Sequence, residues 1–332
     1  MVSVEYLAGF ADGEGSLSLA RRRHPGESVE YSLRVCVYNS HYELLKRIQD
    51  RWGGVMSAVG QRHARWKPAY ALIWTNAKAA NLLEAIGPYL RIKSNHAAAL
   101  LEFQEHVRRC RRTRDSGGRL QRLTKGELIF RENFHDRLKR LNERGVTRGS
   151  EGRRRERRLR PKTPLSPRYL AGFIDGEGSL MIARWTSPRY TRVYYKPRIS
   201  IANTHKEVLQ QIQQVYGGIL ANQPPRKAAW RFAYQLIWTD GMVGPLLSVV
   251  KPYLIIKRDQ ASVLEQLIRS RQRMLQDRKP SAKRSLGIPA SVLAEQAELY
   301  RKVKHLNRRG PPIGGLSNRQ KSSSRPQLYI AR

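Results

Sequence analysis

The stretch YLAGFADGEGSL at residues 6–17 returns almost unchanged as YLAGFIDGEGSL at residues 169–180. Extending the comparison to residues 6–20 and 169–183, 12 of 15 positions are identical. A repeat of this kind means that one chain contains two copies of one structural unit, which we expect to be related by a pseudo-two-fold axis. Whatever chemistry the acidic end of the motif performs is therefore present twice.

The repeat extends well beyond the motif. The segments YALIWT (residues 70–75) and PYLRIK (residues 88–93) return as YQLIWT (residues 234–239) and PYLIIK (residues 252–257). Each copy is large enough to bury its own core. We therefore expect a first domain at residues 1–145, a basic linker at 146–168, a second domain at 169–310 and a basic, irregular tail at 311–332. The linker has nine Arg and Lys against two Glu, which indicates an extended segment that follows phosphates.

The charge balance points to a polyanionic partner. The chain has 63 Lys and Arg against 26 Asp and Glu, a formal charge of +37. Nucleic acid is the partner that this excess favours, because neutralising phosphates releases counterions. An anionic membrane is less favoured, since no long apolar run is present.

Cys36 and Cys110 are the only cysteines and lie far apart, which argues against a zinc module or a disulfide framework and fits a reducing compartment. The motif follows the N-terminus so closely that no presequence is expected, and bacterial cytoplasm and an organelle interior both stay open.

Hydrophobic periodicity predicts the same order of elements in each copy. After the motif helix, leucine and valine alternate with polar residues in two strands, followed by a helix at about residues 42–51 or 206–216 that ends at a Gly-Gly pair. Two more strands and a helix from about residue 77 to the Gly87-Pro88 break complete the unit. The predicted fold class is α+β, with two α-β-β-α-β-β-α domains. Each domain would have a four-stranded antiparallel sheet with helices on one face, and the two open, basic faces would form a saddle for a duplex.

Glycines in the motif predict how its two copies meet. Gly9 and Gly13 lie four residues apart, as do Gly172 and Gly176, which exposes backbone on one helix face. Because glycine costs a helix about 1 kcal/mol relative to alanine, close packing of the two motif helices is the reason we infer for it.

That packing would bring acidic residues together at the helix ends. The four acids are Asp12, Glu14, Asp175 and Glu177. Crowded carboxylates at a helix C-terminus are unfavourable unless a cation lies among them, and oxygen ligands suit Mg²⁺. Metal-assisted phosphodiester hydrolysis is the chemistry that such a site supports. The other interpretation is that these acids pair with the abundant arginines.

The residues LAGFADGEG (7–15) and LAGFIDGEG (170–178) resemble the signature of the LAGLIDADG homing endonuclease family, in its single-chain, two-repeat form. The resemblance implies an intron-encoded, monomeric enzyme that cleaves double-stranded DNA and leaves short 3′ overhangs. It assigns the metal to Glu14 and Glu177, with backbone carbonyls from Gly13 and Gly176. Glu replaces the commoner Asp of the family at this position. The expected ion is Mg²⁺, with Mn²⁺ able to substitute and Ca²⁺ able to bind without supporting cleavage.

The same resemblance suggests roles for further residues. Lys93 and Lys257 match a basic residue near the scissile phosphate, Asn39 and Asn203 match a polar residue that holds a catalytic water, and Asp12 and Asp175 are expected to be structural. An ordinary phosphate contact or a solvated side chain is an equally good interpretation of each lysine.

Outward strand positions are predicted to read the DNA. They are Ser18, Ala20, Arg22, Ser32, Arg34, Cys36, Met181, Trp185, Lys196, Arg198, Ser200 and Gln235. A strand of about nine residues spans about 30 Å, so each half would cover about nine base pairs and the whole site about 18–20. Because the two halves differ in these positions, the site should be asymmetric.

Two other classes of function account for part of the sequence. An intron maturase would use the same basic saddle to bind RNA, but pure RNA binding does not require two crowded carboxylates. A basic nucleoid or ribosomal protein would not explain the duplicated acids at all. No Cys or Ser splice junction lies at the ends of the chain, which argues against an intein.

Overall fold

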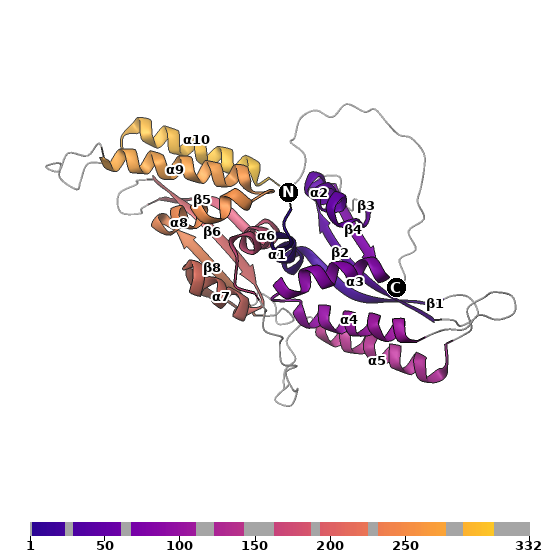
Figure 1. Ribbon diagram of the computed structural model, residues 1–332. Helices are drawn as coiled ribbons and strands as arrows, with labels where there is room; N and C mark the ends of the chain where they lie inside the picture. Colours follow the sequence, from indigo (N-terminus) through magenta and orange to yellow (C-terminus); the bar gives the residue numbers. More distant parts are fainter. Residues whose placement is uncertain are drawn as a thin grey trace, which may run out of the picture.

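The computed structural model describes residues 2–23, 29–60, 68–110, 123–142, 163–186, 193–224, 232–276 and 288–308. Most of the predicted linker (residues 146–162) and the whole predicted tail (residues 311–332) lie outside these ranges. The described chain forms two halves with closely similar architecture, which lie side by side about a central pair of helices (Figure 1).

Within the described ranges, the first half contains nine helices and strands and one short 3-10 turn. In chain order they are α1 (Val4–Glu14), β1 (Gly15–Arg23), β2 (Val29–Asn39), α2 (Tyr42–Trp52), β3 (Val55–Val59), β4 (Ala69–Thr75), α3 (Asn76–Ile86), η1 (Gly87–Tyr89), α4 (Ser94–Arg109) and α5 (Lys125–Asn142). The second half repeats this order, with one extra 3-10 turn. Its elements are α6 (Pro167–Glu177), β5 (Gly178–Thr186), β6 (Val193–Asn203), α7 (Lys206–Tyr216), β7 (Ile219–Gln223), β8 (Ala233–Thr239), η2 (Asp240–Met242), α8 (Val243–Val250), η3 (Lys251–Tyr253), α9 (Arg258–Gln276) and α10 (Ala290–Leu306).

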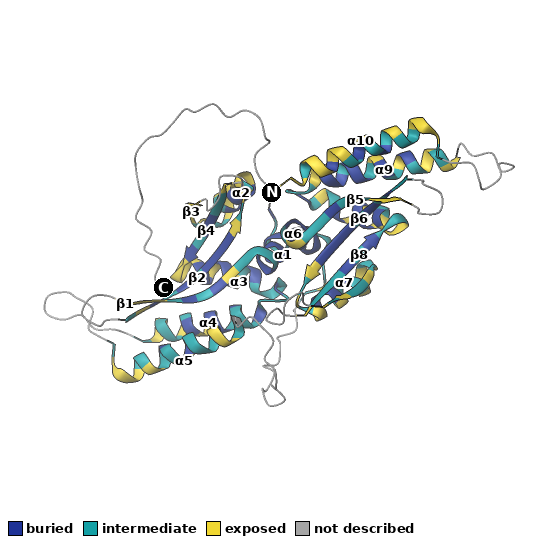
Figure 2. Ribbon diagram, turned by 180° about the vertical axis from the view of Figure 1, so that it is seen from behind, coloured by how far each residue is buried: buried dark blue, intermediate teal, exposed yellow. Residues whose placement is uncertain are grey.

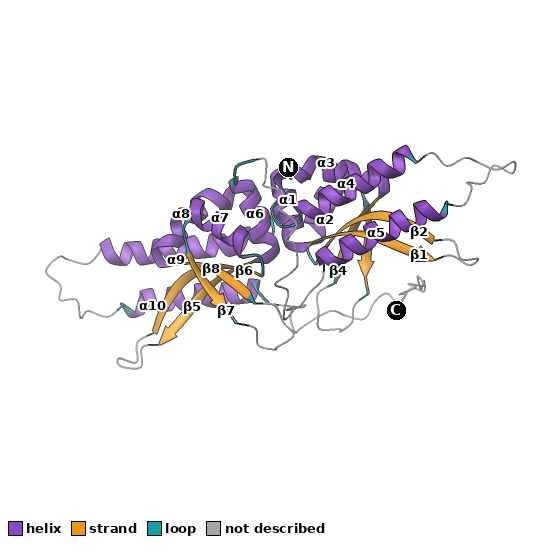
Figure 3. Ribbon diagram, turned by 90° about the horizontal axis from the view of Figure 1, so that it is seen from below, coloured by secondary structure: helices purple, strands orange, loops and turns teal. Residues whose placement is uncertain are grey.

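Each half has one four-stranded antiparallel sheet, as the alternating sequence predicts. The strand orders are β1-β2-β4-β3 and β5-β6-β8-β7. One face of each sheet packs against helices, and apolar positions such as Leu33, Val35 and Trp74 are buried there. Seen from below, the helices and the strands form separate layers over much of the molecule (Figure 3). The α+β fold predicted from the sequence is therefore confirmed.

Each half also has a pair of helices beyond the predicted seven-element unit. The pairs α4–α5 and α9–α10 follow the 3-10 turns and pack beside the first strand of their sheet. In the first pair, Phe103 of α4 meets Phe134 of α5 with ring centroids 5.8 Å apart. These helices are buried where they face the sheet and exposed on their outer sides (Figure 2). They lengthen each half away from the centre.

The motif helices α1 and α6 pack together through their glycines, as predicted. A Cβ atom on Gly9 would lie 2.0 Å from the backbone oxygen of Tyr169, and one on Gly172 would lie 2.0 Å from the backbone oxygen of Tyr6. No side chain larger than hydrogen fits at such an approach, so these two glycines set how closely the halves meet.

None of the helices within the described ranges is both long enough and apolar enough to span a lipid bilayer. Both cysteines are free thiols, with Cys36 buried and Cys110 partly exposed.

Candidate active site between the two motif helices

The predicted metal ligands lie at the C-terminal ends of α1 and α6, where each helix turns into the first strand of its sheet. A Cβ atom on Gly13 would lie 3.1 Å from Cγ of Glu177, and one on Gly176 would lie 3.3 Å from Cγ of Glu14. Each glutamate therefore packs against the glycine of the opposite helix. The structure brings Glu14, Glu177, Gly13 and Gly176 together at the pseudo-two-fold axis, as the sequence predicted.

The two glutamates share an environment that favours a bound cation. Burial raises the pKa of the Glu14 carboxyl, and the neighbouring charge of Glu177 raises it further. Burial also raises the pKa of Glu177, although this residue is the more exposed of the two, so solvent screens part of the effect. The charges of Lys93 and Lys257 oppose both shifts. A divalent cation between the carboxylates would relieve their repulsion, and their oxygens are ligands that suit Mg²⁺.

Lys93 and Lys257 reach the same centre from the turn that follows each 3-10 helix. Lys93 Nζ donates hydrogen bonds to the backbone oxygens of Ala11, at 2.8 Å, and Asp12. Lys257 Nζ donates in the same way to Ile174, at 2.8 Å, and Asp175. Each ammonium thus caps the negative end of a motif helix. Burial lowers the pKa of both lysines, while the nearby acids act in the opposite direction.

Asp12 and Asp175 hold the lysine-bearing turns in place. The Asp12 carboxylate accepts hydrogen bonds from the backbone N–H groups of Arg91 (2.7 Å), Ile92 (3.2 Å) and Lys93 (2.9 Å). It also accepts one from the hydroxyl of Tyr169, at 2.7 Å, which belongs to the other half. With its oxygens used in this way, Asp12 is a structural residue, as expected from the sequence.

Asp175 makes the reciprocal set of bonds. Its carboxylate accepts from the backbone N–H groups of Ile255, Ile256 and Lys257, and from the hydroxyl of Tyr6 at 2.7 Å. Each half therefore completes the support of the other half's site. Burial and the facing aspartate raise the pKa of both tyrosines well above its usual value, so they stay protonated and donate.

The structure gives Asn39 and Asn203 a different task from the predicted one. Asn39 Oδ1 accepts a hydrogen bond from the backbone N–H of His41 at 2.8 Å, and Asn203 Oδ1 accepts one from His205 at 2.9 Å. Asn39 also follows Val35 and Val37 in the strand alternation, so it belongs to the helix-covered face of the sheet. These amides close the turn between strand and helix, and their role at a catalytic water stays a prediction.

Most of the predicted DNA-reading side chains lie on the open faces of the two sheets. The strand pairs Ser18–Arg34 and Met181–Arg198 lie directly opposite each other, and Trp185 is 52% exposed. Cys36 and Ser200 are corrections to the prediction. They have the right register, but their residues are only 2% and 3% exposed because neighbouring side chains cover the middle of the strand. Neither can read a base in this conformation.

Several open-face residues were missed by the sequence reasoning. The short edge strands β3 and β7 pair with β4 and β8 so that alternate residues face the same side as the predicted set. They are Val55, Ser57 and Val59 in the first half and Ile219, Ala221 and Gln223 in the second. Val55 is 65% exposed, so the open face is less uniformly polar than predicted. The alternation of side chains along these two strands was the sequence signal that could have identified these residues.

Corresponding open-face positions of the two halves carry different side chains. Arg22 of β1 corresponds to Trp185 of β5, and Ser32 of β2 corresponds to Lys196 of β6. Lys196 is paired with Asp240 at 3.2 Å. Gln235 accepts a hydrogen bond from Arg198 at 3.4 Å and one from Gln223 at 2.8 Å, whereas Ala71 stands at the equivalent place in the first half. The two open faces therefore present different side chains at equivalent positions.

Comparisons with known proteins agree with this architecture. The model of the LAGLIDADG endonuclease family matches residues 170–237. Among solved structures, the homing endonuclease I-LtrWI bound to its target DNA superposes with a TM-score of 0.66 at 16% identity, over 90% of this chain and 96% of that one. I-GzeII in complex with a DNA target gives 0.62 at 14% identity, over 91% and 98%. I-SmaMI bound to uncleaved DNA with calcium ions gives 0.61 at 14% identity, over 92% and 99%. A separate comparison with curated proteins gives no match.

Proposed function

We propose that this chain is a DNA endonuclease of the LAGLIDADG family, in its single-chain, two-repeat form, and that it cleaves both strands of a long, asymmetric site. One observation carries the proposal: the two motif glutamates meet at the pseudo-two-fold axis between two sheets whose open faces carry basic side chains. The strands of a duplex are themselves related by a two-fold axis. A centre with two equivalent acids can therefore address one scissile phosphate on each strand.

Double-stranded DNA is the partner that the surface and the relatives support. The formal charge of +37 supplies the sequence-independent part of binding. Arg34 and Arg198 lie at equivalent places on the open faces, and Arg favours the O6 and N7 atoms of guanine in the major groove. Strands β2 and β6 have 11 residues each, so each half spans about nine or ten base pairs. The solved relatives bound to target DNA give this proposal its precedent.

Glu14 and Glu177 would hold a divalent metal, which when bound supplies an activated water and stabilises the leaving oxygen. The residues fit this role, since the pKa of both carboxyls is raised by burial and their repulsion calls for a cation. Mg²⁺ is the ion that oxygen ligands of this kind favour, and a relative binds uncleaved DNA with calcium ions. We propose Mg²⁺ for this chain, with Ca²⁺ binding but not supporting cleavage, and short 3′ overhangs as products.

We propose that Lys93 and Lys257 act on the scissile phosphate. Lys93 and Lys257 face both glutamates, and each Nζ is held against two carbonyl oxygens of a motif helix. A cation fixed in this way faces the negative charge that develops on a scissile phosphate without having to reorganise. The aspartate network that holds each lysine turn then acts indirectly, by positioning.

The test is cleavage of a randomised plasmid library in Mg²⁺, followed by sequencing of the ends. The wild-type chain should cut both strands within one site of about 18–20 base pairs. Glu14→Gln and Glu177→Gln should each lower double-strand cleavage at least about a hundredfold while duplex binding persists. Glu43→Gln, on the exposed side of α2, is the matched control and should cut normally. Tight binding to a duplex without cleavage in Mg²⁺ or Mn²⁺ would contradict the proposal.

A further inference from the structure

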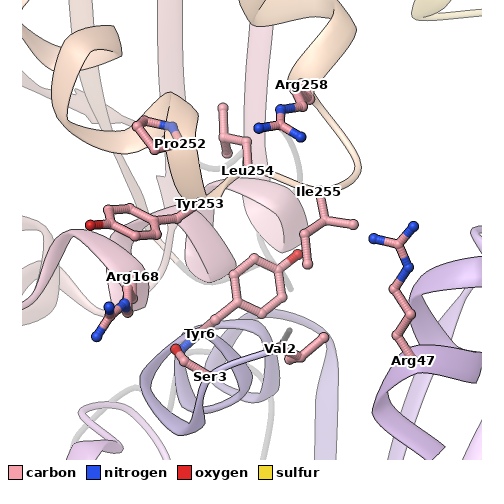
Figure 4. A pocket seen from close by; sticks show the side chains of 10 residues that line it. All are labelled: Val2, Ser3, Tyr6, Arg47, Arg168, Pro252, Tyr253, Leu254, Ile255 and Arg258. Carbon is pink, nitrogen blue, oxygen red and sulfur yellow. The ribbon is translucent and has the colours of Figure 1, made fainter. Parts of the chain in front are cut away.

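A pocket of about 170 Å³ lies between the two halves at the N-terminal end of α1. Its walls come from the start of α1, from α2 and from the turn before α9 (Figure 4). Glu14 stands at the opposite end of α1, about 16 Å away along a helix of 11 residues. The pocket is therefore a separate place from the acidic centre, on the helical side of the molecule.

Three arginines surround this pocket. Arg47 comes from α2 of the first half, whereas Arg168 and Arg258 come from α6 and α9 of the second half. Figure 4 shows the Arg47 guanidinium beside Ile255, the Arg258 guanidinium near Leu254, and Arg168 near Tyr253. The positive end of α1 lies in the same wall, since Val2 and Ser3 precede its first turn. The charge of the pocket is strongly positive.

Little within the described part of the chain neutralises this charge. Arg168 is 3.6 Å from Glu5, an ion pair with one partner half exposed. Arg47 and Arg258 are exposed and have no acidic partner within the described ranges. Two unpaired guanidinium groups that border one concave space leave their planar sets of donors available to an anion.

At the equivalent place in the other half, side chains of the protein itself fill the space. There Arg91 occupies the place of Ile255, and Gln211 occupies the place of Arg47. Arg91 donates to Gln211 at 3.1 Å and to the backbone oxygen of Thr163 at 3.0 Å, and it covers the ring of Tyr169. In this copy the protein satisfies its own arginine. The three-arginine pocket lacks that arrangement and has arginine at the positions of Glu5, Ser94 and Gln211.

We propose that the three-arginine pocket binds a phosphate group of a second nucleic-acid segment, on the side of the molecule opposite the open sheets. Arginine pairs bind phosphate oxygens in a bidentate way, and the chain's excess of 37 positive charges favours nucleic acid as the source of the phosphate. Because the arginines come from both halves, the bound phosphate also ties the halves together. The site is independent of cleavage and goes beyond the proposed endonuclease activity.

The first experiment uses inorganic phosphate and no metal. Thermal unfolding of the full chain is compared in phosphate and in chloride at equal ionic strength. Phosphate should raise the unfolding midpoint by about 2 °C or more, because it binds only the folded protein. The Arg47→Gln/Arg258→Gln double variant should lose this rise. The control is Arg140→Gln/Arg301→Gln, which removes the same charge from exposed positions on α5 and α10 and should keep the rise.

The second experiment identifies the source. The protein is saturated with duplex in Ca²⁺, a labelled single strand of DNA or RNA is added, and native mass spectrometry counts both ligands on one chain. The wild type and the control should form the ternary complex, and the double variant should bind the strand about tenfold more weakly. An equal loss in the double variant and the control would overturn the proposal. A phosphate effect without any ternary complex would overturn nucleic acid as the source.

Discussion

The two halves agree closely at the acidic centre and differ at several positions of the open sheet faces and of the helical side. Asp12 binds three backbone N–H groups at 2.7, 3.2 and 2.9 Å, and Asp175 binds its three at 2.7, 3.1 and 2.9 Å. On the open faces, by contrast, Arg22 corresponds to Trp185, and on the helical side Arg91 corresponds to Ile255. The comparison teaches that the duplicated chain has two equal supports for its acidic centre and different side chains on its two surfaces.

The largest effect is expected from breaking the glycine contact that creates the symmetry. Gly9→Ala would place a Cβ atom 2.0 Å from the backbone oxygen of Tyr169. Since that oxygen belongs to a packed helix, the two helices must separate, and we expect a loss of at least about 3 kcal/mol in the free energy of unfolding. Urea unfolding measures it. Gly126→Ala is the control, because nothing beyond its own helix backbone and chain neighbours lies within 4 Å of the added carbon, and it should change stability by less than about 1 kcal/mol.

A similar loss in the two variants would mean that the packing of α1 on α6 does not depend on its glycines. Gly172→Ala, which meets the backbone oxygen of Tyr6 at 2.0 Å, should cost as much as Gly9→Ala.

The aspartate network gives the next largest effect and tests whether the two supports are equal. Asp12→Asn replaces a carboxylate that accepts four hydrogen bonds by an amide with one acceptor atom. We expect about 3 kcal/mol of destabilisation, and the same from Asp175→Asn. Tyr169→Phe removes only the bond between the halves and should cost about 1 kcal/mol. Unequal costs for the two aspartates, measured by chemical unfolding, would contradict the symmetry.

The glutamate pair should make metal binding depend on pH. The pKa of Glu14 and of Glu177 is raised in the metal-free fold, so the folded state holds more protons than the unfolded state just above the ordinary carboxyl pKa. Protonation of the two glutamates therefore stabilises the fold at low pH, and this contribution is lost as the pH rises through their raised pKa values. Ca²⁺ should then bind more tightly at pH 8 than at pH 5, with a difference of about 1–2 kcal/mol in thermal stabilisation. The Glu14→Gln/Glu177→Gln double variant should show no such difference. A pH-independent effect of Ca²⁺ on the wild type would place the metal elsewhere.

The smallest effect concerns one position where the open faces differ. Gln235→Ala removes the amide between Arg198 and Gln223 and makes the second sheet resemble the first, which has Ala71 there. We expect discrimination at one base pair of the second half-site to fall by about 1 kcal/mol. Binding to duplexes with single base-pair changes measures it. The first half-site is the internal control, and a uniform loss across both halves would show that Gln235 only supports general affinity.

The sequence predicted the centre well because the information there is local and duplicated. Gly9 and Gly172 predicted the close helix contact, and the meeting of the four acids followed from their place at the helix ends. The choice of Glu14 and Glu177 among these acids came from the family resemblance. The bonds from Asp12 to the turn at Arg91–Lys93 join residues about 80 positions apart. The family resemblance could suggest that Asp12 is structural, but not which backbone groups it holds.

The periphery was predicted less completely, for two physical reasons. Helix α4 has Ala97, Leu100 and Phe103 at helical spacing, so its signal was present and was not used. The burial of Cys36 and Ser200 could not be found in this way, because period-two alternation assigns a face and not the degree to which neighbours cover it. Cys36 lies on the predicted face, yet its surroundings raise the pKa of its thiol by burial.

The crossed bonds from Tyr6 to Asp175 and from Tyr169 to Asp12 make the interface complementary to itself. Each half presents a tyrosine, an aspartate and a bare glycine face, and each receives the same three features. A half separated from the other by cutting the connecting segment would thus expose a surface that fits a second copy of itself. The covalent connection, rather than the interface, is what makes each molecule hold one half of each kind, and with them two different recognition surfaces.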